Sequence, residues 1–176
     1  MLQRDIYPKD FIKEHFIEKL GEIILIDPYM SFLLVCSGIE FLGKCIDSKC
    51  EWRKPGLSKK HFENAIIELF PERYHDLRKQ MYSNLRCGMV HMSGPGTIIV
   101  TQNKNDPYGV HPYKKHPDYV KTDGKELKVF VIEYFYFDFV EACKKVLSKD
   151  FEFGDKMNDS FLCVGPVASL IPKDKD

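Results

Sequence analysis

The chain has 176 residues, of which 44% are hydrophobic and 30% are charged. This length and composition suit one ordinary domain with a real core and argue against disorder of the whole chain. Lys and Arg together number 26, as do Asp and Glu, so the formal net charge is zero. Bulk charge therefore cannot hold the protein on nucleic acid or on an anionic membrane, and any such contact needs a local patch.

The sequence also argues against a membrane span, a secreted protein and a zinc site. Its apolar runs are far shorter than the roughly 20 residues that cross a bilayer, and its first residues do not read as a signal peptide. The six cysteines contain no Cys-x-x-Cys pair. We expect a reduced, cytoplasmic compartment and no zinc, although an even number of cysteines leaves disulfides formally possible.

Helical periodicity dominates the first half of the chain. Apolar residues recur at spacings of three and four between Ile12 and Ile24, which predicts an amphipathic helix over 9–25. Asp27-Pro28 is a helix start signal, with Asp27 as cap and Pro28 in the first turn. The helix that follows, over 28–47, is apolar nearly all round, so we expect it to be the central buried helix.

Two more helices are expected before a firm stop. Ser58 is placed to cap a third helix that ends near Phe70, and Pro71 separates it from a fourth helix over about 72–93. The sequence Ser93-Gly94-Pro95-Gly96 ends that fourth helix. Residues 44–93 carry ten Lys or Arg against six Asp or Glu. This excess permits a local surface for an anionic ligand, although a solvated helix face is the simpler explanation.

Two short segments of the second half have strand character. Residues 97–101 are rich in β-branched side chains and 127–131 alternate, so we expect them to pair as a small antiparallel ribbon. Residues 102–125 between them are expected to form a surface loop, in which His111 and His116 are ordinary loop histidines rather than metal ligands. Tyrosines and lysines are interleaved in this loop, a weak signal for contact with single-stranded RNA.

A last helix is predicted over 133–149, followed by a tail over 150–176. The tail keeps enough apolar residues to pack on the body of the protein, apart from its charged end. The expected fold is therefore mainly α, with a small β insertion, in one domain over 1–176.

The pattern that can carry chemistry lies at the end of the fourth helix, in Leu85-Arg86-Cys87-Gly88-Met89-Val90-His91. An arginine can bind a phosphate bidentately, and a histidine can take or give a proton near neutral pH. Arg86 and His91 both point away from the core but diverge by about 140° around an ideal helix. Two such helices packed across a symmetry axis would bring both pairs into one cleft, so we expect a homodimer. A surface arginine and a histidine stabilised by the helix dipole are the simpler alternatives.

This string closely resembles the Arg-x4–6-His motif of HEPN domains, especially of their prokaryotic branch. The resemblance covers roughly residues 10–93 and 133–149, including the apolar second helix with its acidic residue, Glu40. It implies an HEPN-like antiparallel bundle of four to five helices that dimerises. It also implies a metal-independent endoribonuclease without a cofactor, often a toxin or defence effector, for which an antitoxin or another protein is a candidate partner. The position after the arginine is often strongly polar in the family and is Cys87 here.

The resemblance gives the catalytic roles to Arg86 and His91. Arg86 would stabilise charge on the scissile phosphate, and His91 would act as general base or acid for attack by the neighbouring 2′-hydroxyl. Glu40 needs a partner, because an unpaired carboxylate in an apolar helix is costly. Lys44, four residues later, is the favoured partner, and the alternative is that Glu40 orients Arg86.

Two neighbours of the motif and a second function complete the expectations. Tyr82 and Asn84 lie where they could contact a base or a ribose, although partial core burial is the stronger expectation for Tyr82. The alternative function is a non-catalytic HEPN-like helical module that binds RNA, a nucleotide or a protein partner. Zero net charge and Cys87 favour this module, whereas intact Arg86 and His91 favour the nuclease. The chain has no P-loop, dinucleotide-binding or Gly-x-Ser-x-Gly motif, so redox, nucleotide-hydrolase and serine-hydrolase functions have no support.

Overall fold

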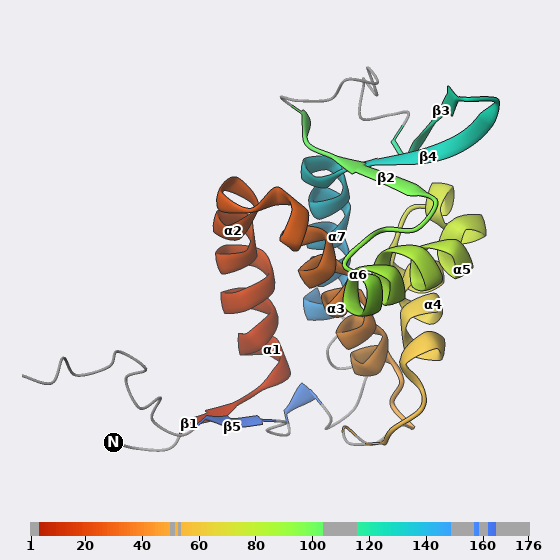
Figure 1. Ribbon diagram of the computed structural model, residues 1–176. Helices are drawn as coiled ribbons and strands as arrows, with labels where there is room; N and C mark the ends of the chain where they lie inside the picture. Colours follow the sequence, from red (N-terminus) through yellow and green to blue (C-terminus); the bar gives the residue numbers. More distant parts are fainter. Residues whose placement is uncertain are drawn as a thin grey trace, which may run out of the picture.

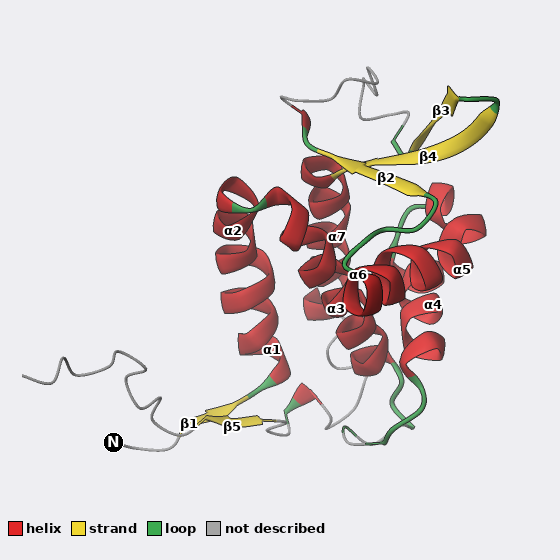
Figure 2. Ribbon diagram, viewed as in Figure 1, coloured by secondary structure: helices red, strands yellow, loops and turns green. Residues whose placement is uncertain are grey.

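The protein is mainly helical in a computed structural model, with a small three-stranded sheet lying against one end of the helices (Figures 1 and 2). The structure describes residues 4–49, 52, 54–103, 116–148, 157–158 and 162–164. The predicted mainly α fold class is confirmed at this level.

The first helical run extends from Pro8 to Ile26 without a break. It consists of α1 (Pro8–Phe11), a segment with wider π-type turns, η1 (Ile12–Lys19), and α2 (Leu20–Ile26). This agrees with the helix predicted over 9–25. Its buried apolar residues, which include Ile12, Leu20 and Ile24, join the main core.

The second helix, α3 (Pro28–Ile46), begins where the sequence predicted. The Asp27 carboxylate accepts a hydrogen bond of 2.9 Å from the Met30 backbone N–H. Pro28 stands in the first turn, where a helix has no use for its missing N–H. Nine residues of α3 are buried, more than in any other described helix, because it packs between several other helices (Figure 1).

Helix α3 is also the one described helix whose length and apolar character would let it cross a membrane. Half of that stretch is buried inside the protein. Core helices of globular proteins have the same composition, because they are covered by apolar neighbours rather than by lipid.

The third helix, α4 (Ser58–Leu69), is not capped as predicted. Leu57 occupies the cap position without a side-chain hydrogen bond, and Ser58 is the first helical residue. The predicted cap at Ser58 is therefore wrong.

The fourth helical run extends from Glu72 to Met92, close to the predicted 72–93, but its turns are not uniform. It consists of a 3₁₀ segment, two α segments and a π-type segment: η2 (Glu72–Leu77), α5 (Arg78–Gln80), η3 (Met81–Cys87) and α6 (Gly88–Met92). Ser93, with a left-handed φ of 50°, ends it.

The small sheet has the strand order β2-β4-β3 and contains β2 (Ile98–Thr101), β3 (Asp118–Thr122) and β4 (Lys125–Val131). Strands β3 and β4 form an antiparallel hairpin, whereas β2 runs parallel to β4, with Ile98 opposite Lys128. The predicted antiparallel pairing of 97–101 with 127–131 is therefore wrong. The physical reason is β3: because β4 is the return strand of its hairpin, β4 runs in the same direction as β2.

The prediction of a surface loop over 102–125 is wrong for the residues from 116 onwards. Strand β3 begins there, and His116 and Pro117 before it are buried. Asp123 and Gly124 form the hairpin turn with φ of 52° and 73°. Asp-Gly is a preferred pair for such two-residue turns, so this signal was present in the sequence. Residues 104–115, including His111 and most of the interleaved tyrosines and lysines, lie outside the described residues.

Helix α7 (Ile132–Ser148) follows β4 directly, close to the helix predicted over 133–149. Its buried Phe135 and Phe139 pack in the main core, where Phe135 stacks on Phe32 of α3. Of the 150–176 tail, the structure describes Met157, which is buried in the core, and β5 (Leu162–Val164). Strand β5 pairs antiparallel with β1 (Arg4–Ile6) near the first helix (Figure 1).

Candidate functional site

Arg86 of η3 forms an ion pair with Glu40 of α3. Its Nε donates to Oε2 of Glu40 over 2.9 Å, and the two side chains are 25% and 22% exposed. Burial alone would lower the pKa of Arg86, but the charge and hydrogen bond of Glu40 outweigh it, so the pKa is raised. Among the described ion pairs Glu40 is held by Arg86 and not by Lys44, which corrects the partner that the sequence favoured.

The hydrogen bond to Glu40 uses one edge of the Arg86 guanidinium. Within the described part of the chain, Nε is its only nitrogen with a hydrogen-bond partner. Two terminal nitrogens, Nη1 and Nη2, therefore keep their donors. Such a pair of donors matches two oxygens of a phosphate or a carboxylate.

Tyr82 belongs to the same cluster, one turn before Arg86. Its half-buried ring packs edge-on against Phe62, with 5.6 Å between ring centroids. Burial and the neighbouring Cys87 raise the pKa of the Tyr82 hydroxyl. Tyr82 is thus partly a core residue, as the sequence favoured, with its hydroxyl close to the Glu40–Arg86 pair.

Asn84 stabilises the turn that follows the helix. Its side-chain amide donates to Oγ1 of Thr97 over 2.7 Å. The same turn closes on Gly88: the Gly94 N–H donates to the Gly88 carbonyl, and a Cβ added to Gly88 would lie 2.5 Å from the Gly94 oxygen. Asn84 and Gly88 therefore fold the chain back over the motif helix, so that part of the motif is explained by packing.

His91 lies in the last turn of α6 and is exposed. In the described residues nothing holds its ring by a hydrogen bond or an ion pair. The helix end itself is fixed, because the Tyr29 hydroxyl donates to the Ser93 carbonyl over 2.6 Å. The structure places Arg86 and His91 on one helical run but does not bring them into contact with each other within the chain described.

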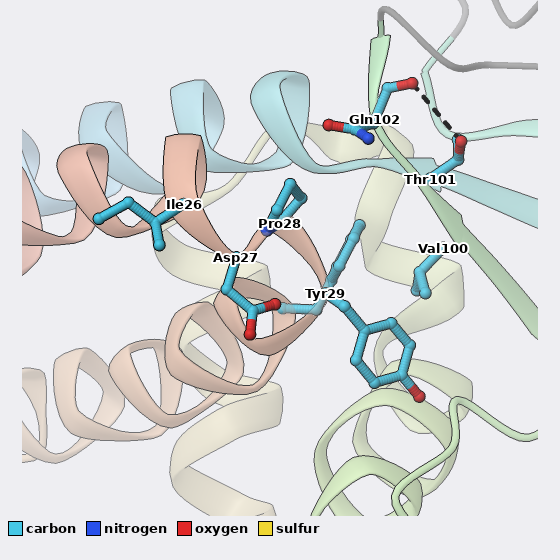
Figure 3. A pocket seen from close by; sticks show the side chains of 8 residues that line it. Ile26, Asp27, Pro28, Tyr29, Val100, Thr101 and Gln102 are labelled. Carbon is cyan, nitrogen blue, oxygen red and sulfur yellow. Dashed lines mark hydrogen bonds between the residues drawn. The ribbon is translucent and has the colours of Figure 1, made fainter.

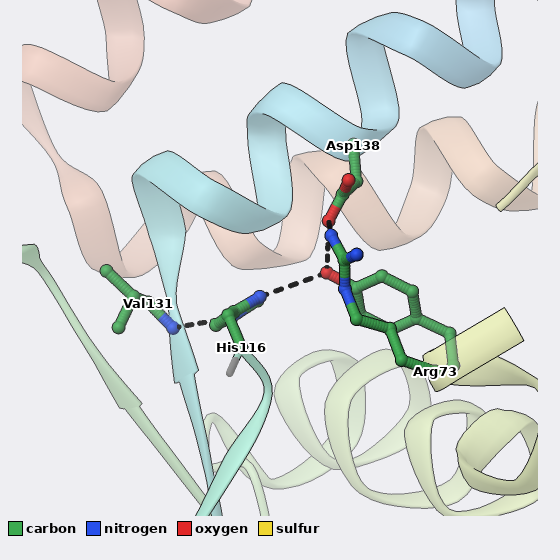
Figure 4. A network of polar contacts seen from close by, with 5 residues as sticks. Arg73, His116, Val131 and Asp138 are labelled. Atoms are coloured by element: carbon green, nitrogen blue, oxygen red, sulfur yellow. Dashed lines mark hydrogen bonds and ion pairs between the residues drawn. The ribbon is translucent and has the colours of Figure 1, made fainter. Parts of the chain in front are cut away.

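Sequence reasoning missed a second polar cluster, which is buried between the sheet and the helices (Figure 4). The Val131 N–H donates to Nε2 of His116 over 3.0 Å, so the ring proton is on Nδ1, which lies 3.0 Å from the Tyr74 hydroxyl. The Tyr74 hydroxyl donates to Oδ2 of Asp138, and Arg73 binds the same oxygen, each over 2.6 Å. The chain of donors and acceptors from β4 to α7 is thereby complete.

At neutral pH the His116 ring of this cluster is uncharged and the Tyr74 hydroxyl keeps its proton. Burial, with a smaller contribution from Arg73, lowers the pKa of His116 to about 3. Burial and the Asp138 charge raise the pKa of Tyr74 well above its ordinary value. The cluster therefore fastens the start of β3 and the end of β4 to η2 and α7. The sequence alone could not predict this cluster, because the partners of His116 come from segments that are distant along the chain.

The structure has a pocket of about 320 Å³ where the corner between α2 and α3 meets β2 (Figure 3). Residues 26–29 and 100–102 line it, together with Phe32. Its charged side chain, Asp27, already accepts the cap hydrogen bond from Met30. No group of three His, Cys, Asp or Glu side chains in the described residues is arranged to hold a metal ion.

Comparison of the chain with protein-family models, with curated proteins and with solved structures finds no match. The candidate site is therefore supported by its own geometry and by the motif: a half-buried arginine oriented by a glutamate, with an exposed histidine on the next helical segment.

Proposed function

We propose that the protein is an HEPN-like, metal-independent endoribonuclease in which Arg86 binds the scissile phosphate and His91 transfers the proton. The observation that carries this proposal is the pair between Glu40 and Arg86. Glu40 fixes Nε and leaves Nη1 and Nη2 of a partly exposed guanidinium without a partner in the described chain. This arrangement suits the binding of two phosphate oxygens.

The proposed reaction is an internal attack on phosphorus. The His91 imidazole takes the proton of the RNA 2′-hydroxyl, whose oxygen bonds to the adjacent phosphorus while the bond to the 5′-oxygen breaks. A water molecule protonates that oxygen, and the His91 imidazolium returns its proton to the resulting hydroxide, which leaves a 5′-hydroxyl and a 2′,3′-cyclic phosphate. The donors of Arg86 offset the negative charge that develops on the phosphate oxygens.

A homodimer formed largely by the fourth helical run would complete this site. Arg86 and His91 diverge by about 140° on a regular helix, and a two-fold axis would bring His91 of one protomer towards Arg86 of the other. Beside His91, Val90 and Met92 are 46% and 73% exposed and offer apolar surface for this contact. We place the dimer in the cytoplasm, where an RNA substrate and the four cysteines that the structure describes as free belong, and an antitoxin would be a fitting protein partner.

The test is cleavage of an RNA oligonucleotide in EDTA. The wild type should cut the RNA and leave cyclic phosphate ends, whereas His91→Ala should not, with an unchanged melting temperature because the side chain is exposed. Lys79→Ala, which removes an exposed cation from the same helical run, is the control and should cut normally. Cleavage that needs magnesium, or that persists in His91→Ala, would contradict the mechanism.

The second candidate function is the non-catalytic HEPN-like module. It is favoured by the packing contacts of Asn84 and Gly88 in the turn after the helix, because these contacts explain part of the motif without any reaction. The same experiment decides between the two: RNA that is bound by the wild type but remains intact would establish the module.

A further inference from the structure

Besides the pocket beside β2, the structure has a groove of about 400 Å³ between the first helical run and α3. The proposed nuclease site does not include this groove. Apolar side chains form most of its lining: Phe11, Phe16, Leu20, Ile23, Leu34 and Phe41. The volume is in the range of small-molecule sites, which are typically apolar with a few polar groups.

Aromatic side chains form the base of the groove. Phe16 and Phe41 contact each other edge-on, with 5.5 Å between ring centroids, and Phe16 meets Phe139 of the core at 5.4 Å. The π-type turns of η1 form one wall. Such turns are rare in proteins, and where they occur they often lie at functional sites. Their place beside a groove is therefore a second sign of a binding site.

Three polar residues, His15, Lys19 and Ser37, lie among the lining residues. Lys19 is exposed and has no ion pair among the described residues. The half-buried His15 ring lies tilted against Phe11, with 4.6 Å between ring centroids. The ionisable residues of the lining are thus a lysine and a histidine, and no carboxylate opposes them there. A ligand that fits this groove is apolar along its length and anionic at one end.

We propose that this groove binds a single-chain fatty carboxylate, with its hydrocarbon chain on Phe16, Leu20 and Phe41 and its carboxylate beside Lys19. A nucleobase fits the lining less well, because its ring edge carries several donors and acceptors that six apolar side chains leave unpaired. The carboxylate stays at the rim, where water and Lys19 both reach it.

The chain contains its own reporter for this binding. Trp52 is its single tryptophan and stacks on Phe41 with 5.5 Å between ring centroids. Titration of the full chain with hexanoate, octanoate and decanoate should therefore change the Trp52 emission. Each added methylene should tighten Kd about twofold to fourfold, the upper value being full burial at about 0.8 kcal/mol per methylene. Octanol, which has the same chain without the charge, should bind severalfold more weakly than octanoate.

Matched variants locate the ligand. Lys19→Ala should weaken octanoate severalfold and leave octanol unchanged, whereas Lys13→Ala, at an exposed position outside the groove, should change neither. Leu34→Glu should abolish octanoate binding, and Leu25→Glu, on the exposed end of α2, should not. A Kd that is independent of chain length, octanol binding as tight as octanoate, or full octanoate binding by folded Leu34→Glu would each overturn the proposal.

Discussion

The two polar clusters of this protein use similar side chains for different ends. The Glu40–Arg86 pair is about a quarter exposed and leaves guanidinium donors without partners in the described chain. The His116–Tyr74–Asp138 cluster is almost completely buried, and each hydrogen bond of its chain is made within the protein. A histidine, a tyrosine and an aspartate in a row suggest catalysis, yet these three side chains are at most 2% exposed and out of reach of a substrate. Solvent access to the carboxylate therefore separates the proposed site from the structural cluster, because Glu40 is 22% exposed and Asp138 only 2%.

The largest expected effect comes from opening the buried cluster. Asp138→Ala would remove the acceptor of both Tyr74 and Arg73 at a position that is 2% exposed. The loss of one partner of a buried pair destabilises a protein by about 3–5 kcal/mol, and urea unfolding should show a loss of this size. Glu141→Ala removes a surface carboxylate of the same helix and should cost less than about 1 kcal/mol. Equal losses of unfolding free energy in the two variants would mean that the buried cluster does not stabilise the fold.

The next effect is a dependence of stability on pH that comes from His116. Its folded pKa is lowered to about 3, below the ordinary value of 6.5, so the unfolded chain binds the proton more readily. The contribution of His116 is therefore complete above pH 6.5 and is lost as pH falls towards 3, by about 2 kcal/mol at pH 5. Urea unfolding at pH 7 and pH 5 should show this loss, and His116→Gln should reduce it. A wild type and a variant with the same pH dependence would count against a neutral, buried His116.

The smallest expected change in stability is at the open pair, where the effect on activity should be large. Glu40→Gln removes the charge that orients Arg86, and partly exposed pairs contribute only about 0–1 kcal/mol to stability. RNA cleavage should nevertheless fall by at least tenfold, because the guanidinium loses its fixed orientation. Glu63→Gln, which removes the carboxylate that pairs with Lys59, is the control and should leave cleavage unchanged. Full activity of Glu40→Gln would show that this pair does not position Arg86.

The parts of the fold that depend on local pattern could be predicted from the sequence. The start of α3 follows from Asp27-Pro28, and the extents of the helices follow from apolar periodicity. The pairing of β2 with β4 could not be predicted in the same way, because its direction depends on a third strand. The sequence does contain the Asp123-Gly124 turn signal, whose use would have placed β3 and its hairpin with β4.

The candidate site likewise has features that local sequence predicts and features that depend on tertiary packing. The motif places Arg86 and His91 on one helix, but the partner of Glu40 lies 46 residues away and is set by the packing of η3 on α3. Local spacing favoured Lys44, since only neighbours within a helix are visible in a sequence. The burial of His116 was equally hidden, because Tyr74 and Asp138 come from two other helices.

Mixing two inactive variants tests most directly whether Arg86 and His91 act on the same phosphate across a dimer. Arg86→Ala and His91→Ala should each fail to cleave RNA in EDTA. After subunit exchange in an equal mixture, half of the dimers should contain both variants, each with one intact composite site. Cleavage should therefore return to about a quarter of the wild-type rate. A mixture that remains as inactive as its components, although exchange is complete by native mass spectrometry, would contradict the shared site.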